Sequence, residues 1–411
     1  MLKKITLTTL ALAGFSSVAA AEDGPFGYQP VHNVQVGPRP YYLVDKMSNG
    51  PLKRRLETCK DAPKHVTDFS IGHRGAPLQF PEHTLESYVA AARMGSGILE
   101  CDVTFTADGE LVCRHAECDL HTTTDILATP LASKCSVPPD YTSAEPFRNV
   151  RCCTSDIDYS DFKTLCAKMD AGNRSAATLD EYLNSTAQWR TDLYSTCGTL
   201  LSHREAVQLF GELNVGQTPE LKGGDATRIA AVFGSQANYA QALIDDLKAE
   251  GVPPWRAWPQ SFNPDDVFYW INNEPAYGQQ AVFLDGRYTQ EISAREFRDL
   301  KAAGLNIIAP PMQILLTTNS RGRIVQSKYA RRAKRAGLDI ISWTTERSGR
   351  VNEEIIPGGG NFYYDTTVSA LRNDGDILTQ IHVLARQVGI IGLFSDWPGT
   401  TSYYASCMEL E

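Results

Sequence analysis

Residues 71–115 read IGHRGAPLQFPEHTLESYVAAARMGSGILECDVTFTADGELVCRH and carry the clearest structural pattern in this 411-residue chain. Apolar residues after Thr84 recur at helical spacing, and Thr84 itself suits a helix N-cap. Further on, apolar and polar residues alternate as in a strand, and Asp108-Gly109 is a hairpin signal. The predicted elements are a strand ending at residue 71, a helix over 84–94, a strand over 98–106 and a hairpin partner over 111–115.

The same alternation of strands and helices returns after residue 200. Strands are predicted over 210–221, 281–285, 306–309, 339–343 and 390–394. Helices are predicted over 226–250, closed by Gly251, and over 294–303 and 328–336. Strands that alternate with helices over such a length predict parallel βα units. We therefore expect an α/β fold, specifically a (β/α)8 TIM barrel, with a doubly wound open sheet as the alternative.

The first 21 residues predict export from the cell. Lys3 and Lys4 precede an apolar run that ends in three alanines, a pattern typical of a secretory signal peptide cleaved before Glu22. No later stretch has the apolar length that a membrane span needs. We expect a secreted or periplasmic protein with no stable membrane anchor, an irregular N-terminal extension over 22–65 and a TIM-barrel domain over 66–405.

The chain holds ten cysteines, an even number that predicts several disulfides in an exported protein. Their pairing does not follow from the sequence. Half of them fall between Cys118 and Cys166, so we interpret residues 128–178 as a Cys-rich insertion held by disulfides. A zinc site is disfavoured because C-x-x-C occurs nowhere in the chain.

The formal net charge is -9, and removal of Lys3 and Lys4 with the signal peptide makes the protein more acidic still. Such a protein is not expected to bind nucleic acid or anionic membranes non-specifically. Any phosphate site must therefore be a local basic pocket.

Glu100 and Asp102 form the sharpest local feature. On a strand, side chains two positions apart point to the same face, so both carboxylates project together. Two acidic groups this close repel unless a cation lies between them, and oxygen ligands suit a hard ion such as Ca²⁺ or Mg²⁺. Taken alone, such a pair is more often a solvated face of a strand.

Further polar residues follow other predicted strands. His73 and Arg74 come directly after the first strand, where the loops of a barrel build its active face. Arg74 can hold two phosphate oxygens through its planar guanidinium. His115 ends the hairpin partner, and two converging histidines could serve as general base and general acid. Glu220 and Lys222 repeat the two-residue spacing at a later strand end.

The stretch 71–115 resembles the signature of the glycerophosphodiester phosphodiesterase family. In that family an HRG loop, a PE-[NH]-T helix start, an E-x-D strand and a second His follow in this order. Shorter matches come later in family order: TPELK at 218–222, PQSF at 259–262, SWT at 342–344 and SDWP at 395–398. The resemblance implies a TIM barrel with its site at the C-terminal face.

The resemblance also implies roles for eight residues. The acid and base would be His73 and His115. The phosphate would be held by Arg74 and Lys222, and Trp343 would line the pocket. One divalent cation, Ca²⁺ or Mg²⁺, would be bound by Glu100, Asp102 and Glu220. Glu82 receives no role, because a carboxylate in the first turn of a helix is favoured by the helix dipole alone. Which histidine acts as base is left open.

One position departs from the family pattern. Asp usually follows the second His, and here that position is Ala116. An adjacent carboxylate could orient or tune His115, so the pKa of that histidine is in question. We interpret the change as a subfamily variant and not as loss of activity.

The resemblance implies metal-dependent hydrolysis of small glycerophosphodiesters to glycerol 3-phosphate and an alcohol. Two other functions stay open. A sphingomyelinase D-like phospholipase shares the barrel and the two histidines and acts on lipid headgroups. A secreted binding protein could keep the barrel without turnover.

Overall fold

The computed structural model of the protein describes residues 24–191, 193–194, 197–351 and 362–410, so the expected signal peptide over 1–21 lies outside the described residues. The strands of the barrel are β1 (Thr67–Gly72), β2 (Ser96–Leu99), β3 (Asp102–Phe105), β5 (Gly216–Gln217), β6 (Glu220–Leu221), β7 (Gln260–Ser261), β8 (Val282–Leu284), β9 (Ile307–Ala309), β12 (Asp339–Thr345) and β13 (Gly392–Ser395). β4 (Leu111–Cys113) pairs antiparallel with β3, and β10 (Leu316–Thr318) pairs antiparallel with β11 (Ile324–Gln326).

Parallel pairings close these strands into a ring. β1 pairs with β2, and β2 pairs with β5. β3 follows β2 in the chain and β6 follows β5, and these two continuations pair with each other. The ring then runs through β7, β8, β9, β12 and β13, and β13 pairs with β1. The predicted TIM barrel is confirmed.

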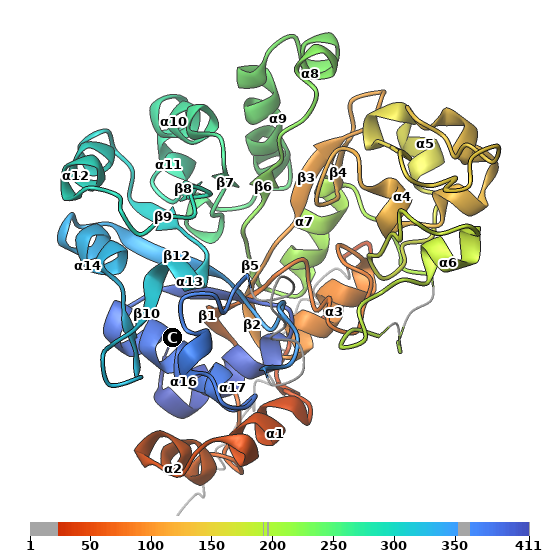
Figure 1. Cartoon of the computed structure of the whole chain (residues 1–411). Helices are drawn as coiled ribbons and strands as arrows, with labels where there is room; N and C mark the ends of the chain where they lie inside the picture. The colour runs from red at the N-terminus through yellow and green to blue at the C-terminus, as the bar shows by residue number, and fades with distance from the viewer. Residues whose placement is uncertain (1–23, 192, 195–196, 352–361, 411) are drawn as a thin grey trace, which may run out of the picture.

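Helices surround this ring (Figure 1). They are α3 (Leu85–Arg93), α7 (His203–Glu212), α8 (Ala226–Phe233), α9 (Gln236–Ala249), α10 (Pro264–Asn273), α11 (Pro275–Gly278), α12 (Ala294–Ala302), α13 (Met312–Leu315), α14 (Lys328–Arg335), α16 (Asp376–Val383) and α17 (Pro398–Met408). Their apolar faces pack on the outside of the strands, while a smaller cluster that includes Ile71, Val282 and Phe394 fills the barrel interior. Among the described residues, no helix is both long and apolar enough to cross a membrane.

The α3 start agrees with the prediction, because the Thr84 hydroxyl accepts the Ser87 backbone N–H. Two other predictions were wrong in part. Phe210 lies in α7 and not in a strand, because Ser202 and Glu205 form a capping box that starts a helix upstream of it. The helix expected over 226–250 is two helices, separated at Gly234, whose φ of +80° suits glycine.

The segment before the barrel is more regular than expected. It contains α1 (Arg39–Lys46) and α2 (Pro51–Thr58), which contact α16 and α17. Figure 1 shows α1 and α2 beside α17, at the opposite side of the molecule from the Cys-rich insertion, which carries α5 (Tyr159–Phe162) and is flanked by α4 (Leu120–Thr123) and α6 (Leu179–Leu183). The insertion and the residues that flank it share an apolar core of their own, which includes Phe147, Phe162 and Tyr182.

All ten cysteines form disulfides, as the even count predicted. The pairs are Cys59–Cys407, Cys101–Cys113, Cys118–Cys153, Cys135–Cys152 and Cys166–Cys197. Three of them hold the insertion. One joins the residue that directly follows α2 to α17, and one joins Cys101, between Glu100 and Asp102, to β4.

Removal of the Cys59–Cys407 link should destabilise the whole barrel. It joins residues 348 positions apart, and closing a long loop restricts the unfolded chain most. We expect Cys59→Ala/Cys407→Ala to lower the free energy of unfolding in urea by about 2–5 kcal/mol. The matched variant Cys135→Ala/Cys152→Ala opens a separation of only 17 and should cost less. An equal or larger cost in the matched variant would contradict the expectation.

Candidate active site

His73 lies directly after β1 and is only 7% exposed. Its backbone N–H donates to the Ser395 carbonyl, which fixes the loop against β13. The Nδ1 atom lies 2.5 Å from Oδ1 of Asp396, and Nε2 lies 4.0 Å from Oε2 of Glu100. Burial lowers the pKa of His73, and the Asp396 carboxylate opposes that effect. Asp396 therefore orients the imidazole so that Nε2 faces the carboxylates.

Arg74 adopts a left-handed backbone conformation, with a φ of +57°. Its N–H donates to Oε2 of Glu100 at 3.0 Å, and its guanidinium donates to Oε2 of Glu82 at 3.0 Å. The next residue must be glycine, because a Cβ at Gly75 would lie 2.3 Å from the Ser87 hydroxyl. The HRG loop is thus folded tightly over the predicted metal ligands.

Glu100, Asp102 and Glu220 come together as predicted. Each has an oxygen within 4.8 Å of the others, and Asp102 is aligned with Glu220 in the β3–β6 pair. Gln260 donates to Oε1 of Glu100 at 2.9 Å. Among the described residues, Oδ1 of Asp102 is buried and has no hydrogen-bond partner. Three buried carboxylates with an unpartnered oxygen fit a hard divalent cation.

The charges of this cluster support that fit. Burial, with the carboxylates of Asp102 and Glu220, raises the pKa of Glu100 well above its usual range. Burial also raises the pKa of Glu220 to about 8, although Lys222 forms an ion pair with it. A cation placed among the three would favour their ionised forms.

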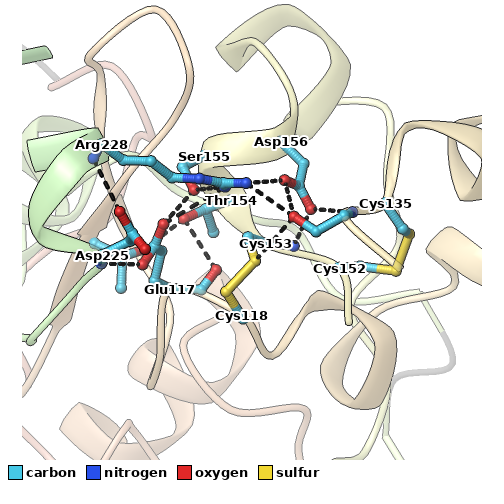
Figure 2. Close-up of a disulfide and its surroundings, with 12 residues drawn as sticks. Glu117, Cys118, Cys135, Cys152, Cys153, Thr154, Ser155, Asp156, Asp225 and Arg228 are labelled. Atoms are coloured by element: carbon cyan, nitrogen blue, oxygen red, sulfur yellow. Dashed lines mark hydrogen bonds and ion pairs between the residues drawn. A yellow bond between two sulfur atoms is a disulfide. The ribbon is translucent and has the colours of Figure 1, made fainter. Parts of the chain in front are cut away.

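A second group of candidate ligands does not hold a metal. Glu117, Cys118 and Cys153 lie close together, but the two sulfurs form a disulfide and offer no thiolate. Figure 2 shows Glu117 turned toward Ser155 and Asp225, and its Oε2 accepts the Asp225 N–H at 2.7 Å. Arg228 also bonds Asp156 at 2.9 Å, so this cluster ties the insertion to α8.

A cavity of about 340 Å³ lies above the carboxylates. Seven of the eight predicted site residues line it: His73, Arg74, Glu100, His115, Glu220, Lys222 and Trp343. The eighth, Asp102, is 1% exposed and lies beneath the cavity, where His83 Nε2 contacts its Oδ2 at 2.9 Å. Burial and the Arg74 and Lys222 cations hold the pKa of His115 well below its usual value.

Ala116 leaves no carboxylate directly after His115, but the Asp119 carboxylate, three residues after Ala116, contacts this turn. The Ala116 N–H donates to Oδ2 of Asp119 at 3.0 Å. Burial raises the pKa of Asp119 to about 6, and Arg114 opposes that effect. The backbone after His115 is therefore fixed by Asp119.

Sequence reasoning missed three charged residues around the cavity. Asp396 falls in the quoted SDWP match but received no role. Glu82 is not in the first turn of α3, since Thr84 is the N-cap, and its carboxylate pairs with Arg74. Arg347 follows β12 with no motif to mark it, yet it lies 3.2 Å from Asp396 and 3.6 Å from Glu82.

The Cys-rich insertion reaches this network. Oδ2 of Asp170 lies 3.3 Å from Arg347, and Asp170 also pairs with Arg190. Arg190 in turn donates to the Pro77 carbonyl at 2.9 Å, just beyond the HRG loop. The insertion thus packs against the loop that holds His73 and Arg74.

Asp396→Asn should lower kcat by about 10- to 100-fold with little change in KM, because the carboxylate orients His73 and does not line the cavity. A useful control is Asp246→Asn, which breaks a similar contact of 3.0 Å to His203 between α7 and α9. Steady-state kinetics on both variants checks this. Equal losses in the two variants would contradict a specific role for Asp396.

Comparison with known proteins gives consistent findings. The sequence model of the "Glycerophosphoryl diester phosphodiesterase family" matches residues 73–400. An "Extracellular protein" of Arthroderma benhamiae is 40% identical over 247 residues, which cover 59% of this chain and 100% of that protein. A "Probable glycerophosphodiester phosphodiesterase 1" of Mycobacterium tuberculosis is 51% identical over 47 residues, covering 11% of this chain and 17% of that protein.

A solved structure shares the fold. The "Putative glycerophosphoryl diester phosphodiesterase" from Silicibacter pomeroyi superposes with a TM-score of 0.55 at 18% identity. The match covers 87% of this chain and 98% of that one. At this identity the likeness concerns the architecture of the barrel.

Proposed function

Because this chain belongs to the glycerophosphoryl diester phosphodiesterase family, we propose that it hydrolyses small glycerophosphodiesters to glycerol 3-phosphate and an alcohol. One observation carries the proposal. His73, His115, Arg74 and Lys222 line a single cavity above three buried carboxylates. Two proton-transfer groups and two cations around the candidate metal site are the parts that phosphoryl transfer needs.

In the proposed reaction, Arg74 and Lys222 hold the phosphate. One histidine accepts the proton of the glycerol hydroxyl that neighbours the phosphoester, and this oxygen attacks phosphorus. The other histidine starts protonated, a form that the bound phosphate favours because its charge offsets Arg74 and Lys222. It donates this proton to the departing alcohol oxygen as the bond between that oxygen and phosphorus breaks. Because both reacting groups belong to one molecule, orientation replaces a bimolecular encounter.

The second step reverses the two roles. The histidine that lost its proton now accepts one from water, which attacks the cyclic phosphate. The histidine that gained a proton returns it to the glycerol oxygen as the ring opens. The products are glycerol 3-phosphate and two histidines in their starting states.

The proposed cofactor is one Ca²⁺ or Mg²⁺ ion held by Glu100, Asp102 and Glu220. When bound, it would neutralise charge on the phosphate and make the attacking hydroxyl more acidic. Gln260 and the Arg74 N–H keep Glu100 in place for it.

We also propose that the protein is exported after cleavage of residues 1–21. The charged and apolar start of the chain supports this, as do the five disulfides, which persist in oxidising compartments. The similarity to a protein named as extracellular agrees with it.

The substrate class can be tested with a panel. Mature protein is incubated with glycerophosphocholine, glycerophosphoglycerol, lysophosphatidylcholine and sphingomyelin, and the products are identified. We expect fast turnover of the glycerophosphodiesters and slow turnover of the lipids. A cyclic phosphate that accumulates from the lipids would instead assign a sphingomyelinase D-like phospholipase. No turnover of any compound would favour a binding protein.

A further inference from the structure

One wall of the active-site cavity is built from five aromatic side chains. They are Phe262, Tyr288, Trp343, Phe362 and Tyr363, and all five line the cavity. Their ring centroids form a continuous chain: Phe262 lies 5.7 Å from Trp343, Trp343 lies 6.4 Å from Phe362, and Phe362 lies 5.4 Å from Tyr288 and 4.9 Å from Tyr363. Phe262 and Tyr288 follow β7 and β8, Trp343 belongs to β12, and Phe362 and Tyr363 come later in the chain.

Three rings of the aromatic wall lie outside the hydrophobic core, while Trp343 and Tyr363 pack against it. Phe262 and Phe362 are each 40% exposed, and Tyr288 is 56% exposed. Large aromatic residues are normally covered, and their exposure together in a cavity marks a binding surface. The Trp343 ring is held in place, because its indole N–H donates to the Ala309 carbonyl at 2.8 Å.

The backbone is shaped to present these rings. Tyr288 has a φ of +50°, which is unusual for a bulky residue and persists only where the surroundings fix it. Gly286 lets the loop after β8 approach Phe262, since a Cβ there would lie 3.0 Å from the Phe262 ring. Both features bring the loop after β8 against the other rings.

The chemistry of the wall suits a cation without hydrogen-bond donors. The phenylalanine rings offer no hydrogen-bond partner to a polyol, and the Trp343 indole N–H already donates to the Ala309 carbonyl. Of these five side chains, the two tyrosines alone offer free polar groups, their hydroxyls. The π faces attract cations, and Nζ of Lys222 already lies 5.8 Å from the Phe262 ring centroid. Aromatic cages of this kind bind quaternary ammonium groups.

We propose that the aromatic wall selects a substrate whose leaving alcohol carries a quaternary ammonium, as choline does. This inference rests on the proposed function, because it places the alcohol half of a glycerophosphodiester against the wall. Once the phosphate is bound, its charge offsets Arg74 and Lys222, so a cationic headgroup is not repelled from the cavity.

The test compares glycerophosphocholine with its neutral isostere, the glycerophosphodiester of 3,3-dimethylbutanol. The two have the same shape and differ in charge. We expect kcat/KM to favour the choline compound by about 3- to 30-fold. Tyr288→Leu and Phe362→Leu should each reduce that ratio toward one. Trp255→Leu is the control, since Trp255 is 66% exposed, stacks near Arg256 and lies outside the cavity lining.

A binding measurement separates this inference from the proposed function. Phosphocholine and 3,3-dimethylbutyl phosphate are titrated by calorimetry, which needs no turnover. Tighter binding of phosphocholine, lost in Tyr288→Leu, supports the wall as a cation site even if neither diester is hydrolysed. Equal affinity of the wild type for the two phosphates, or an equal loss of affinity for both in Tyr288→Leu, would overturn the inference. Lysophosphatidylcholine, tested beside glycerophosphocholine, shows whether the headgroup comes from a lipid or a soluble diester.

Discussion

His73→Ala and His115→Ala should each lower kcat by about 10²–10⁴-fold. The two residues come from β1 and from the end of the β3–β4 hairpin, yet both line the same cavity. Substrate binding should survive, because Arg74 and Lys222 still hold the phosphate. KM is therefore expected to change little while kcat falls.

The double variant makes this prediction sharper. If the histidines are base and acid of one transfer, His73→Ala/His115→Ala should lose far less than the product of the two single losses. His382→Ala is the control, because His382 lies on α16 and contacts the Tyr404 hydroxyl at 2.9 Å, away from the cavity. Near-normal turnover in either single variant would show that the site works differently, and the Ala116 departure would then be the first place to look.

Chelation should abolish activity, and Ca²⁺ or Mg²⁺ should restore it. Glu100→Gln and Asp102→Asn are expected to weaken metal affinity by more than about 100-fold. This exceeds the loss of about 10- to 100-fold that is typical when a residue hydrogen-bonded to a metal ligand is changed, because these two residues would bind the metal directly. Metal added to the wild type should raise its Tm, because a ligand that binds the folded state stabilises it. The same addition should leave the Tm of Glu100→Gln nearly unchanged.

Metal-free stability gives an independent readout. Glu100 is buried beside two other carboxylates, so the metal-free Glu100→Gln protein should be at least as stable as the metal-free wild type. Glu110→Gln, on the β3–β4 hairpin but outside the cluster, is the matched control. Full activity in excess chelator, with no metal found in the purified protein, would show that the reaction needs no metal.

Local patterns predicted the parts of the site that lie close in sequence. The two-residue spacing of Glu100 and Asp102 brought both carboxylates into one cluster, and Cys101 between them pairs with Cys113 instead. The HRG loop and Thr84 cap were also readable, because a tight turn and a helix start depend on neighbouring residues.

Contacts between distant segments could not be predicted. Asp396 orients His73 from 323 positions away, and Arg347 and Asp170 meet only because the insertion folds back onto the barrel. Disulfide pairing among ten cysteines is likewise a property of the folded chain. The error at Phe210 has a local cause, since apolar residues of a short helix can also be taken for a buried strand.

The most direct test identifies which ester bond is cut. Glycerophosphocholine is incubated with mature protein and Ca²⁺ or Mg²⁺, and the products are followed by ³¹P NMR. If the glycerol hydroxyl attacks phosphorus and the other alcohol departs, the phosphorus signal must become that of glycerol 3-phosphate, with free choline released. Phosphocholine and free glycerol would mean that the opposite bond is cut, and would contradict the assigned attack and leaving group.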